Sequence, residues 1–390
     1  MLPPTPGHLP TPSREAQAAS AALEALIRTE MEHAGGWLSF ARYMELALYA
    51  PGLGYYSAGS AKFGEEGDFV TAPELSPLFA RCLARQVAQL IGAGVPDVLE
   101  LGAGSGTLPA GLLMELDALD RLPGRYLILE VSADLKSRQQ HRLATLAPHL
   151  RKLVHWVDAL PGGLNTTVVA NEVLDAIPVH IVRTRGGEIE ELGVTVTDHN
   201  SKFARRYRPA AGEVLHAAEA LGLPEDDYET EVSLAAPALL KTLAGALDRG
   251  ALLFIDYGFP AREYYHPQRS RGTLMCHSRH RTHDDPFALV GLQDITAHVD
   301  FTAIACAGAD AGLQALGYTS QAQFLVNLGI TDLLGETPAD ATRAYASLAA
   351  QAQKLLSPAE MGELFKVLAL GRGISEPLVG FARGDRTHTL

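Results

Sequence analysis

Cysteine, basic side chains and long apolar runs are all scarce in this 390-residue sequence. Its three cysteines lie far apart and form no CxxC pair, which excludes a disulfide framework and a cysteine zinc site and indicates a reducing compartment. No apolar run approaches the ~18 residues of a membrane-spanning helix, so we expect no membrane insertion. Lysine and arginine number 32 against 45 aspartate and glutamate, and the net charge of -13 argues against nucleic-acid binding because phosphate would be repelled.

Targeting signals are also missing from the start of the sequence. Prolines stand at positions 3, 4, 6, 10 and 12, with neither the charged and apolar regions of a secretory signal nor the arginines of a mitochondrial transit peptide. We therefore expect a disordered tail over residues 1–12 and a cytoplasmic protein.

Metal-binding patterns are weak. His277, His280 and His283 recur every three residues, but Gly272 and Pro286 oppose a long helix there, and no HExxH pattern occurs. We expect no metal site. The five arginines in the same part of the chain would suit a phosphate, the carboxylates of a partner or simply solvent.

The sequence does contain an apolar run that ends in a carboxylate and is followed by three glycines, DVLELGAGSGTL at 97–108. Glycine lets the backbone turn tightly against a ligand, and the helix that follows offers free N–H groups. Further apolar runs end at Glu130 and Asp158. A strand, a glycine turn, a helix and a strand ending in an acid form a mononucleotide-binding unit, in which the acid binds ribose hydroxyls.

The spacing of the glycines indicates which cofactor binds. Gly102, Gly104 and Gly106 follow GxGxG, and Thr107 stands where a dehydrogenase would have its third glycine. Glu100 would repel a pyrophosphate but suits a cation. S-adenosylmethionine carries an amino group and a positive sulfonium and no phosphate, so we predict this cofactor. Glu130 would then bind its ribose and Asp158 would approach its adenine amino group; a dehydrogenase is the more distant alternative.

Helices and strands alternate along most of the chain, which predicts an α/β fold with a mostly parallel sheet. We expect an N-terminal helical cap and a cofactor-side loop over 13–95, and a core over 96–383. Insertions are predicted at about 176–233, beginning with a hairpin, and at about 262–370. The alanine-rich segment 302–316 is expected to be helical.

The C-terminal part reads as a series of helices that ends at Gly371. Glycine stops a helix because it takes a left-handed conformation readily. The apolar segment 377–382 is then the predicted last strand of the sheet.

Five segments together resemble the MidA-like family of class I methyltransferases, which includes the mitochondrial arginine methyltransferase needed for assembly of respiratory complex I. They are FGEEGDFVTAPELSPLF (63–79), VLELGAGSGTL (98–108), ANEVLDAIPV (170–179), LFIDYGFP (253–260) and GLQDITAHVDF (291–301). The resemblance runs from about residue 29 to 382. It implies a class I methyltransferase (Rossmann-like) sheet of seven strands with family-specific insertions, and a protein substrate.

The resemblance also implies site residues outside the glycine loop. Thr71 and Pro73 would lie by the cofactor, and Asn171 and Glu172 would follow the fourth strand at the ligand-binding edge of the sheet. The full predicted cofactor site consists of Thr71, Pro73, Glu100, Gly102, Gly104, Gly106, Glu130, Asp158, Asn171 and Glu172.

Methyl transfer from a sulfonium is a direct displacement, so the enzyme mainly aligns the reactants and excludes water. A guanidinium acceptor is charged and planar and would be held by carboxylates. We predict catalytic roles for Glu172 and Asp175, which would share a face if a helical turn forms, and for His298 as a proton acceptor. Alternatively, Asp175 caps a turn, Glu172 only touches cofactor and His298 is structural. Asp256, Tyr257 and Asp294 are further candidates for the acceptor side.

Three interpretations of function remain open from the sequence. The first is a protein arginine methyltransferase, with a respiratory complex I subunit as acceptor. The second is a methyltransferase that acts on a small molecule or another residue. The third is an assembly factor that binds S-adenosylmethionine and grips a respiratory subunit. Either a monomer or a homodimer is compatible with the sequence.

Overall fold

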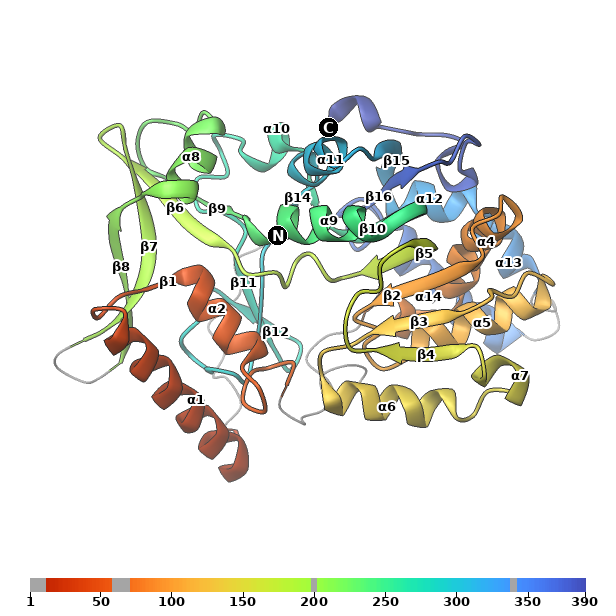
Figure 1. Ribbon diagram of the computed structural model, residues 1–390, viewed down its shortest axis with the longest axis horizontal. Coiled ribbons are helices and arrows are strands. Elements are labelled where there is room, and N and C mark those ends of the chain that lie inside the picture. The colour runs from red at the N-terminus through yellow and green to blue at the C-terminus, as the bar shows by residue number, and fades with distance from the viewer. Residues whose placement is uncertain (1–11, 58–70, 198–201, 337–341) are drawn as a thin grey trace. The chain divides into compact units, whose positions relative to one another are not determined.

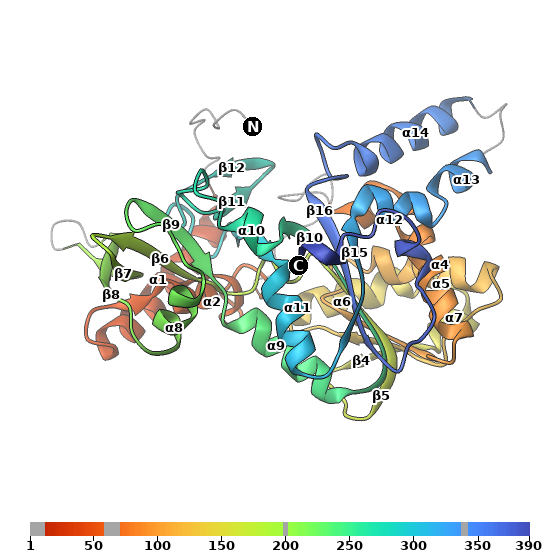
Figure 2. The same cartoon turned by 90° about the horizontal axis from the view of Figure 1, so that it is seen from above.

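The computed structural model describes residues 12–57, 71–197, 202–336 and 342–390. The chain divides into two compact units (Figure 1, Figure 2). Unit 1 comprises the described residues of Met1–Phe69, Asp175–Ala238 and Ala261–His298, and unit 2 those of Val70–Leu174, Leu239–Pro260 and Val299–Leu390. The predicted tail up to residue 11, and residues 63–70 of the first resemblance segment, lie outside the described residues.

Unit 2 is built on a mostly parallel sheet, as predicted. Seven strands follow the order β15-β16-β10-β5-β2-β3-β4, and a short β14 (Val299–Asp300) pairs with the end of β10. All neighbours from β10 to β4 are parallel, whereas β16 is antiparallel to both β10 and β15. The strands are β2 (Asp97–Leu101), β3 (Tyr126–Leu129), β4 (Val154–Val157), β5 (Leu164–Asn171), β10 (Leu247–Phe259), β15 (Gln314–Ser320) and β16 (Phe365–Arg372).

The central strands of this sheet are buried along nearly their whole length, which is typical of a parallel sheet covered on both faces. Figure 2 shows α4 and α5 on one side of the sheet and α9 and α11 on the other. The helices are α3 (Ala72–Leu75), α4 (Pro77–Gly92), α5 (Thr107–Ala118), α6 (Ala133–Leu143), α7 (Pro148–Arg151), α9 (Ala235–Ala246), α11 (Phe301–Asp310), α12 (Gln321–Asn327), α13 (Ile330–Gly335) and α14 (Thr342–Leu356). Phe79, Leu112, Ile128 and Leu253 belong to the core that joins one helical layer to the sheet.

The predictions for the C-terminal part are wrong in two places. The run FKVLALGR, expected to end a helix, forms β16, because its side chains are buried on both faces. A short apolar run of this kind is compatible with a buried helix or strand. Residues 377–382, expected as a strand, contain the short 3₁₀ helix Val379–Phe381 instead, whose backbone N–H groups at Val379 and Gly380 bond the side chains of Gln89 and Gln86 on α4.

The helix expected over 302–316 ends at Asp310, and β15 begins at Gln314. Gly312, with φ of +78°, provides the left-handed residue at which the chain leaves the helix. The predicted insertion at 262–370 therefore contributes three strands, β14, β15 and β16, to the main sheet.

Unit 1 contains two small antiparallel sheets. The first has the order β1-β7-β6-β9, with β8 paired to β7, and the second the order β12-β11-β13. The predicted hairpin is confirmed as β6–β7, which turns through Gly186 and Gly187, both at positive φ. The strands are β1 (Leu38–Ser39), β6 (His180–Arg185), β7 (Glu188–Val196), β8 (Phe203–Pro209), β9 (Tyr228–Val232), β11 (Met275–Ser278), β12 (Arg281–His283) and β13 (Asp294–Thr296).

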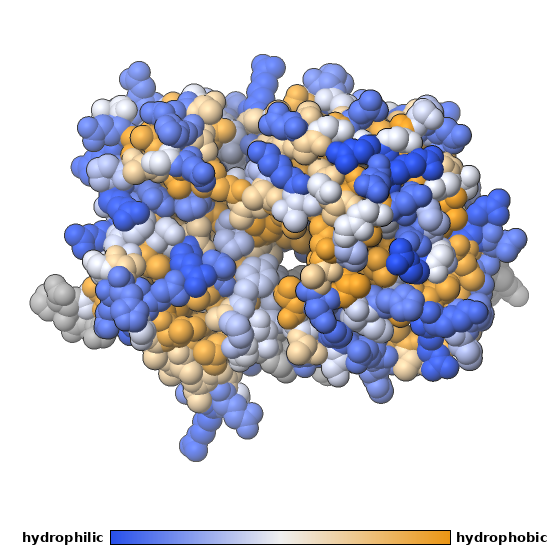
Figure 3. Space-filling model, viewed as in Figure 1, coloured by the Kyte–Doolittle hydropathy of each residue, from blue (hydrophilic) through white to orange (hydrophobic). Residues whose placement is uncertain are grey.

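The helices of unit 1 are α1 (Arg14–His33), α2 (Phe40–Tyr49), α8 (Gly212–Ala220) and α10 (Ala261–Tyr264). The helices α1 and α2 pack on the larger sheet through a core that includes Leu23, Phe40, Tyr43, Leu192 and Val194. Hydrophilic side chains are spread over the face drawn in Figure 3, with apolar patches between them. None of the helices in the described part of the chain is long and apolar enough to cross a membrane.

The buried carboxylate of Glu231 links β9, α10 and the loop before β11 by hydrogen bonds. Glu231 on β9 is 3% exposed and accepts hydrogen bonds from the backbone N–H groups of Thr273 (2.8 Å) and Leu274 (2.9 Å). The hydroxyl groups of Tyr264 and Thr273 donate to its other oxygen at 3.0 and 3.1 Å. The side chain thereby fixes the loop that leads into β11.

Replacing Glu231 with alanine would leave these donors buried without an acceptor. We expect Glu231→Ala to lower the free energy of unfolding by about 3 kcal/mol, measured by urea denaturation. Glu225→Ala, at an exposed position of the same unit, should change it by less than about 0.5 kcal/mol. Equal stabilities of the two variants would contradict this assignment.

Candidate functional site

The three glycines after β2 take conformations that other residues avoid. Gly102, Gly104 and Gly106 have φ of +61°, +53° and +84°. A Cβ atom at Gly106 would lie 3.1 Å from Cα of Gln139, and one at Gly102 would lie 3.5 Å from the side chain of Val173. The loop therefore requires glycine for its backbone shape and, at Gly106, for space.

The loop is tied to the segment that contains Thr71 and Pro73. Thr71 precedes α3, and Glu74 on that helix accepts hydrogen bonds from the hydroxyl groups of Ser105 and, at 2.5 Å, Thr107. The segment therefore lies beside the glycine loop, and its contact with the cofactor remains a prediction. Glu74 belongs to the segment that the resemblance places by the cofactor, but its bonds to the glycine loop were not predicted.

A second network fixes Glu130 at the end of β3. Gln139 on α6 is fully buried and donates from its Nε2 to the carbonyl of Gly104 (3.0 Å) and to Glu130 (2.8 Å). The N–H of Ser132 donates to the other oxygen of Glu130 at 2.9 Å, and Trp156 donates to Gln139 at 2.9 Å. The acid predicted to bind ribose therefore has a fixed orientation beside the glycine loop. Nothing in the local sequence singles out Gln139.

Asp158, predicted to approach the adenine amino group, is not part of the network around Gln139 and Glu130. Its side chain is 89% exposed and forms an ion pair with Lys136 at 3.0 Å. It lies just beyond β4, the strand next to β3, so it shares the carboxyl edge of the sheet with Glu130. Its contact with adenine remains a prediction.

Asn171 and Glu172 meet the Thr71–Pro73 segment at the end of β5. Glu172 has φ of +52°, and its Oε1 accepts hydrogen bonds from the N–H of Ala72 (3.4 Å) and the amide of Asn171 (3.2 Å). Residues 172–175 form no helical turn. The argument that Glu172 and Asp175 share a helical face is therefore wrong, because the chain leaves β5 through a left-handed residue.

Asp175 and His298 belong to unit 1, where main-chain bonds bring their segments together. Ala297 donates its N–H to the carbonyl of Asp175 at 3.0 Å, and His298 donates its N–H to Thr273 Oγ1 at 3.0 Å. Asp175 is buried, and His298 is half-buried. These two predicted catalytic residues are thus neighbours in the fold.

Two tyrosines and a second carboxylate lie near Asp175. Tyr56 donates its hydroxyl to both oxygens of the buried Asp294 at 3.0 Å, and its ring stacks on Tyr49 with centroids 5.4 Å apart. Burial, reinforced by the charge of Asp294, raises the pKa of Tyr56 well above its usual value, so its hydroxyl stays a donor. Tyr49 in turn donates to the carbonyl of Ala176 at 3.0 Å. We call Tyr49, Tyr56, Asp175, Asp294 and His298 the acid–tyrosine cluster.

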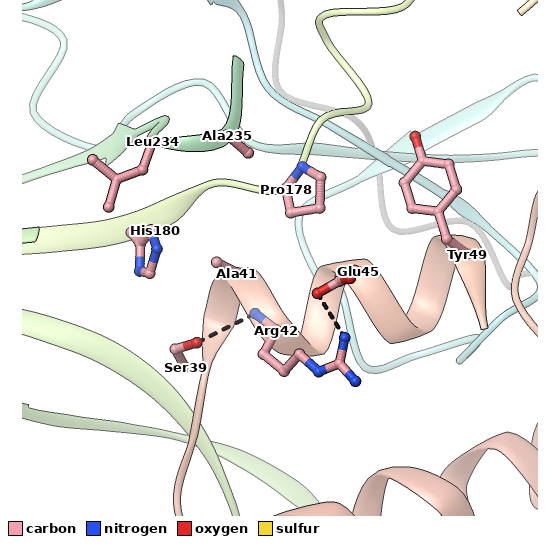
Figure 4. A pocket seen from close by; sticks show the side chains of 9 residues that line it. All are labelled: Ser39, Ala41, Arg42, Glu45, Tyr49, Pro178, His180, Leu234 and Ala235. Carbon is pink, nitrogen blue, oxygen red and sulfur yellow. Dashed lines mark hydrogen bonds and ion pairs between the residues drawn. The ribbon is translucent and has the colours of Figure 1, made fainter. Parts of the chain in front are cut away.

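Tyr49 also lines a cavity of about 590 Å³ in unit 1 (Figure 4). Arg42 in this cavity is neutralised by Glu30 (2.5 Å) and Glu45 (2.7 Å). His180 bonds the buried Glu191 at 2.8 Å. The other lining residues are Ser39, Ala41, Pro178, Leu234 and Ala235. Because the lining residues Arg42 and Glu45 pair with each other, the cavity shows no charge committed to a ligand.

Glu100 lies inside the sheet rather than at its surface. It is 2% exposed, and Tyr126 on β3 donates to its carboxyl group at 2.5 Å. Burial raises the pKa of Glu100 to about 8; the bond from Tyr126 opposes the shift, and the charge of Glu130 adds to it. The carboxyl group is therefore mostly neutral at pH 7, which removes the fixed charge on which our sequence argument relied. Its contact with the cofactor remains a prediction.

This titration gives stability a pH dependence of known sign. The folded pKa of about 8 exceeds the ordinary 4.5, so the contribution of Glu100 to stability is complete below pH 4.5 and is lost as the pH rises to 8. Between these values the wild-type chain should lose about 1 kcal/mol per pH unit relative to Glu100→Gln, measured by urea denaturation. A stability difference that is constant with pH would contradict the assignment.

The glycine loop can be tested by changing one glycine. Gly104→Val forces a β-branched residue to φ of +53°, and we expect it to weaken binding of S-adenosylhomocysteine by at least about a hundredfold in calorimetric titration. Gly163→Val is the matched control, since Gly163 has φ of +68° in the same unit but precedes β5. Retained affinity in Gly104→Val, or equal loss in both, would show that the loop does not hold the cofactor.

Comparison with known proteins agrees with this site. A model of the S-adenosyl-L-methionine-dependent methyltransferase family Methyltransf_28 matches residues 78–319. A protein of Burkholderia thailandensis, crystallised with S-adenosyl-homocysteine, is 52% identical and has a TM-score of 0.94, covering 98% of this chain and 100% of its own.

Two curated relatives cover most of the chain. The zebrafish (Danio rerio) mitochondrial protein arginine methyltransferase NDUFAF7 is 29% identical over 86% of this chain and 84% of its own length. The Drosophila melanogaster homologue is 26% identical over 97% of this chain and 92% of its own length. The family model matches more than half of the sequence, and the glycine loop lies at the edge of a mostly parallel sheet. The chain therefore belongs to the S-adenosyl-L-methionine-dependent methyltransferases of the MidA-like family.

Proposed function

We propose that this methyltransferase modifies an arginine side chain of a protein. The observation that carries the proposal is the similarity to relatives named protein arginine methyltransferases, which extends over 84% and 92% of their lengths and includes both units of this chain. Similarity of that extent supports a shared acceptor chemistry as well as a shared cofactor.

The acid–tyrosine cluster supports an arginine acceptor on chemical grounds. A guanidinium is planar and charged, so it binds well to carboxylates and to aromatic faces. Asp175 and Asp294 supply carboxylates, and the stacked Tyr49 and Tyr56 supply aromatic rings. We assign acceptor recognition to this cluster, with His298 as the group that receives the proton released when the guanidinium is methylated.

Cofactor binding is assigned to unit 2. The cofactor supplies the methyl group on a sulfonium, which is attacked by direct displacement. Gly102, Gly104 and Gly106 let the main chain approach it, and Glu130 binds the ribose hydroxyls with the orientation that Gln139 imposes. The remaining assignments are those of the sequence: Thr71, Pro73, Asn171 and Glu172 beside the cofactor, Glu100 behind the loop and Asp158 toward adenine.

The acceptor that the family resemblance implies is a subunit of respiratory complex I, and we propose the bacterial cytoplasm as the compartment.

Labelling tests the acceptor class directly. We expect the purified protein, given S-adenosylmethionine with a labelled methyl group and a lysate of its host, to label one protein whose hydrolysate contains methylarginine. Asp175→Asn should reduce this labelling by about tenfold or more, because the guanidinium loses a carboxylate, and should leave the affinity for S-adenosylhomocysteine unchanged.

Asp284→Asn, at an exposed position of unit 1, is the control and should label normally. Label in a small-molecule fraction, or methylation of another residue type, would contradict the arginine assignment. Cofactor binding without any labelled product would favour the non-catalytic assembly factor.

A further inference from the structure

Asp256 near the end of β10 is turned toward the main chain, not toward an acceptor. Its side chain is 1% exposed, and its Oδ2 accepts hydrogen bonds from the N–H groups of Val173 (3.2 Å) and Leu174 (2.9 Å). Its Oδ1 accepts one from the N–H of Tyr257 at 2.9 Å. The sequence placed Asp256 among candidates for the acceptor side, and this geometry gives it a different task.

The N–H groups that donate to Asp256 Oδ2 belong to the turn that contains Glu172. β5 ends at Asn171, which is paired with Ile255 on β10. Glu172 and Asp256, the residues that follow this pair, therefore lie where β5 leaves the sheet. The N–H of Glu172 donates to the carbonyl of Ile255 at 2.9 Å. Three consecutive backbone N–H groups, at residues 172, 173 and 174, are therefore bound to two consecutive residues of β10.

This anchoring holds Glu172 in a conformation that it would otherwise avoid. A left-handed backbone costs a non-glycine residue about 1 kcal/mol or more, and φ is +52° at Glu172. The conformation directs its carboxylate to the N–H of Ala72. The same turn places the side chain of Val173 3.5 Å from the Cβ position of Gly102, so it also lies against the glycine loop.

We propose that Asp256 is a positioning residue of the cofactor site, which acts by fixing Glu172 and Val173 against the glycine loop. The proposal rests on the assignment of Glu172 to the cofactor site, but it is independent of the acceptor. It explains why a carboxylate is buried here, because the N–H groups of residues 173, 174 and 257 all need an acceptor and the two oxygens of Asp256 supply it. Lys366, the cross-strand partner of Asp256 on β16, is also buried, and its ammonium group donates to the carbonyl groups of Glu363 and Leu364.

Replacement by asparagine tests this role without removing the side chain. In Asp256→Asn one oxygen becomes an NH₂ group that faces an N–H donor, so the turn should lose its fixed conformation. We expect Asp256→Asn and Glu172→Gln each to weaken binding of S-adenosylhomocysteine by about tenfold in calorimetric titration. If Asp256 acts through Glu172, the double variant should be no more than about threefold weaker than the weaker single variant.

Asp385→Asn is the matched control. Asp385 also accepts backbone N–H bonds, from Tyr318 (3.0 Å) and Thr387 (3.2 Å), but at β15, the far end of the sheet from the glycine loop. It should leave the affinity unchanged and add nothing to Glu172→Gln. Asp256→Glu keeps the charge and moves it by one methylene, and it replaces Asp256→Asn if that variant does not fold. Combined with Glu172→Gln, it should likewise weaken binding by no more than about threefold beyond the weaker single variant.

Losses that multiply in the double variant to about a hundredfold would overturn the proposal, because they would make the effect of Asp256 independent of Glu172. An unchanged affinity in Asp256→Asn or in Glu172→Gln would overturn it as well. Since S-adenosylhomocysteine binding requires no acceptor, these outcomes are distinct from a failure of the arginine assignment, which would affect labelling alone.

Discussion

Hydrogen bonds that fix the carboxyl edge of the parallel sheet are the constraint on which this methyltransferase depends. Where β2 and β5 end, the chain turns through glycines or through the strained Glu172, and each turn is held by a buried side chain from another element. Gln139 holds the glycine loop, and Asp256 holds the turn after β5. Without these bonds the strands would still form, but the turns above them would have no single conformation.

The strands of this sheet could be predicted because burial on both faces makes them short apolar runs, and four of them end near an acid or amide. The same physics explains the failure at β16. The run FKVLALGR has no alternation and no turn residue before Gly371, so its pattern alone does not distinguish a buried strand from a helix. Its pairing with β10 and β15 is a long-range contact that the local sequence does not contain.

The site shows the same division between local and long-range information. The glycines and Glu130 carry local signals, namely spacing and position at a strand end, and their segments lie together as expected. Gln139, the role of Asp256 and the bonds from Glu74 to the glycine loop depend on partners that are distant in sequence, so no local pattern predicts them. For Glu100 the residue type predicted a charge, whereas burial beside Tyr126 makes its neutral form the favoured one near pH 7.

The central claim is that the turns at this edge, from unit 2, hold S-adenosylmethionine. A crystal structure of this protein with S-adenosylhomocysteine tests the claim most directly. Our account predicts the ligand over Gly102–Gly106, with its ribose hydroxyls bonded to Glu130 and with Glu172 still in its left-handed conformation. A ligand bound elsewhere, or a ribose that makes no contact with Glu130, would contradict it.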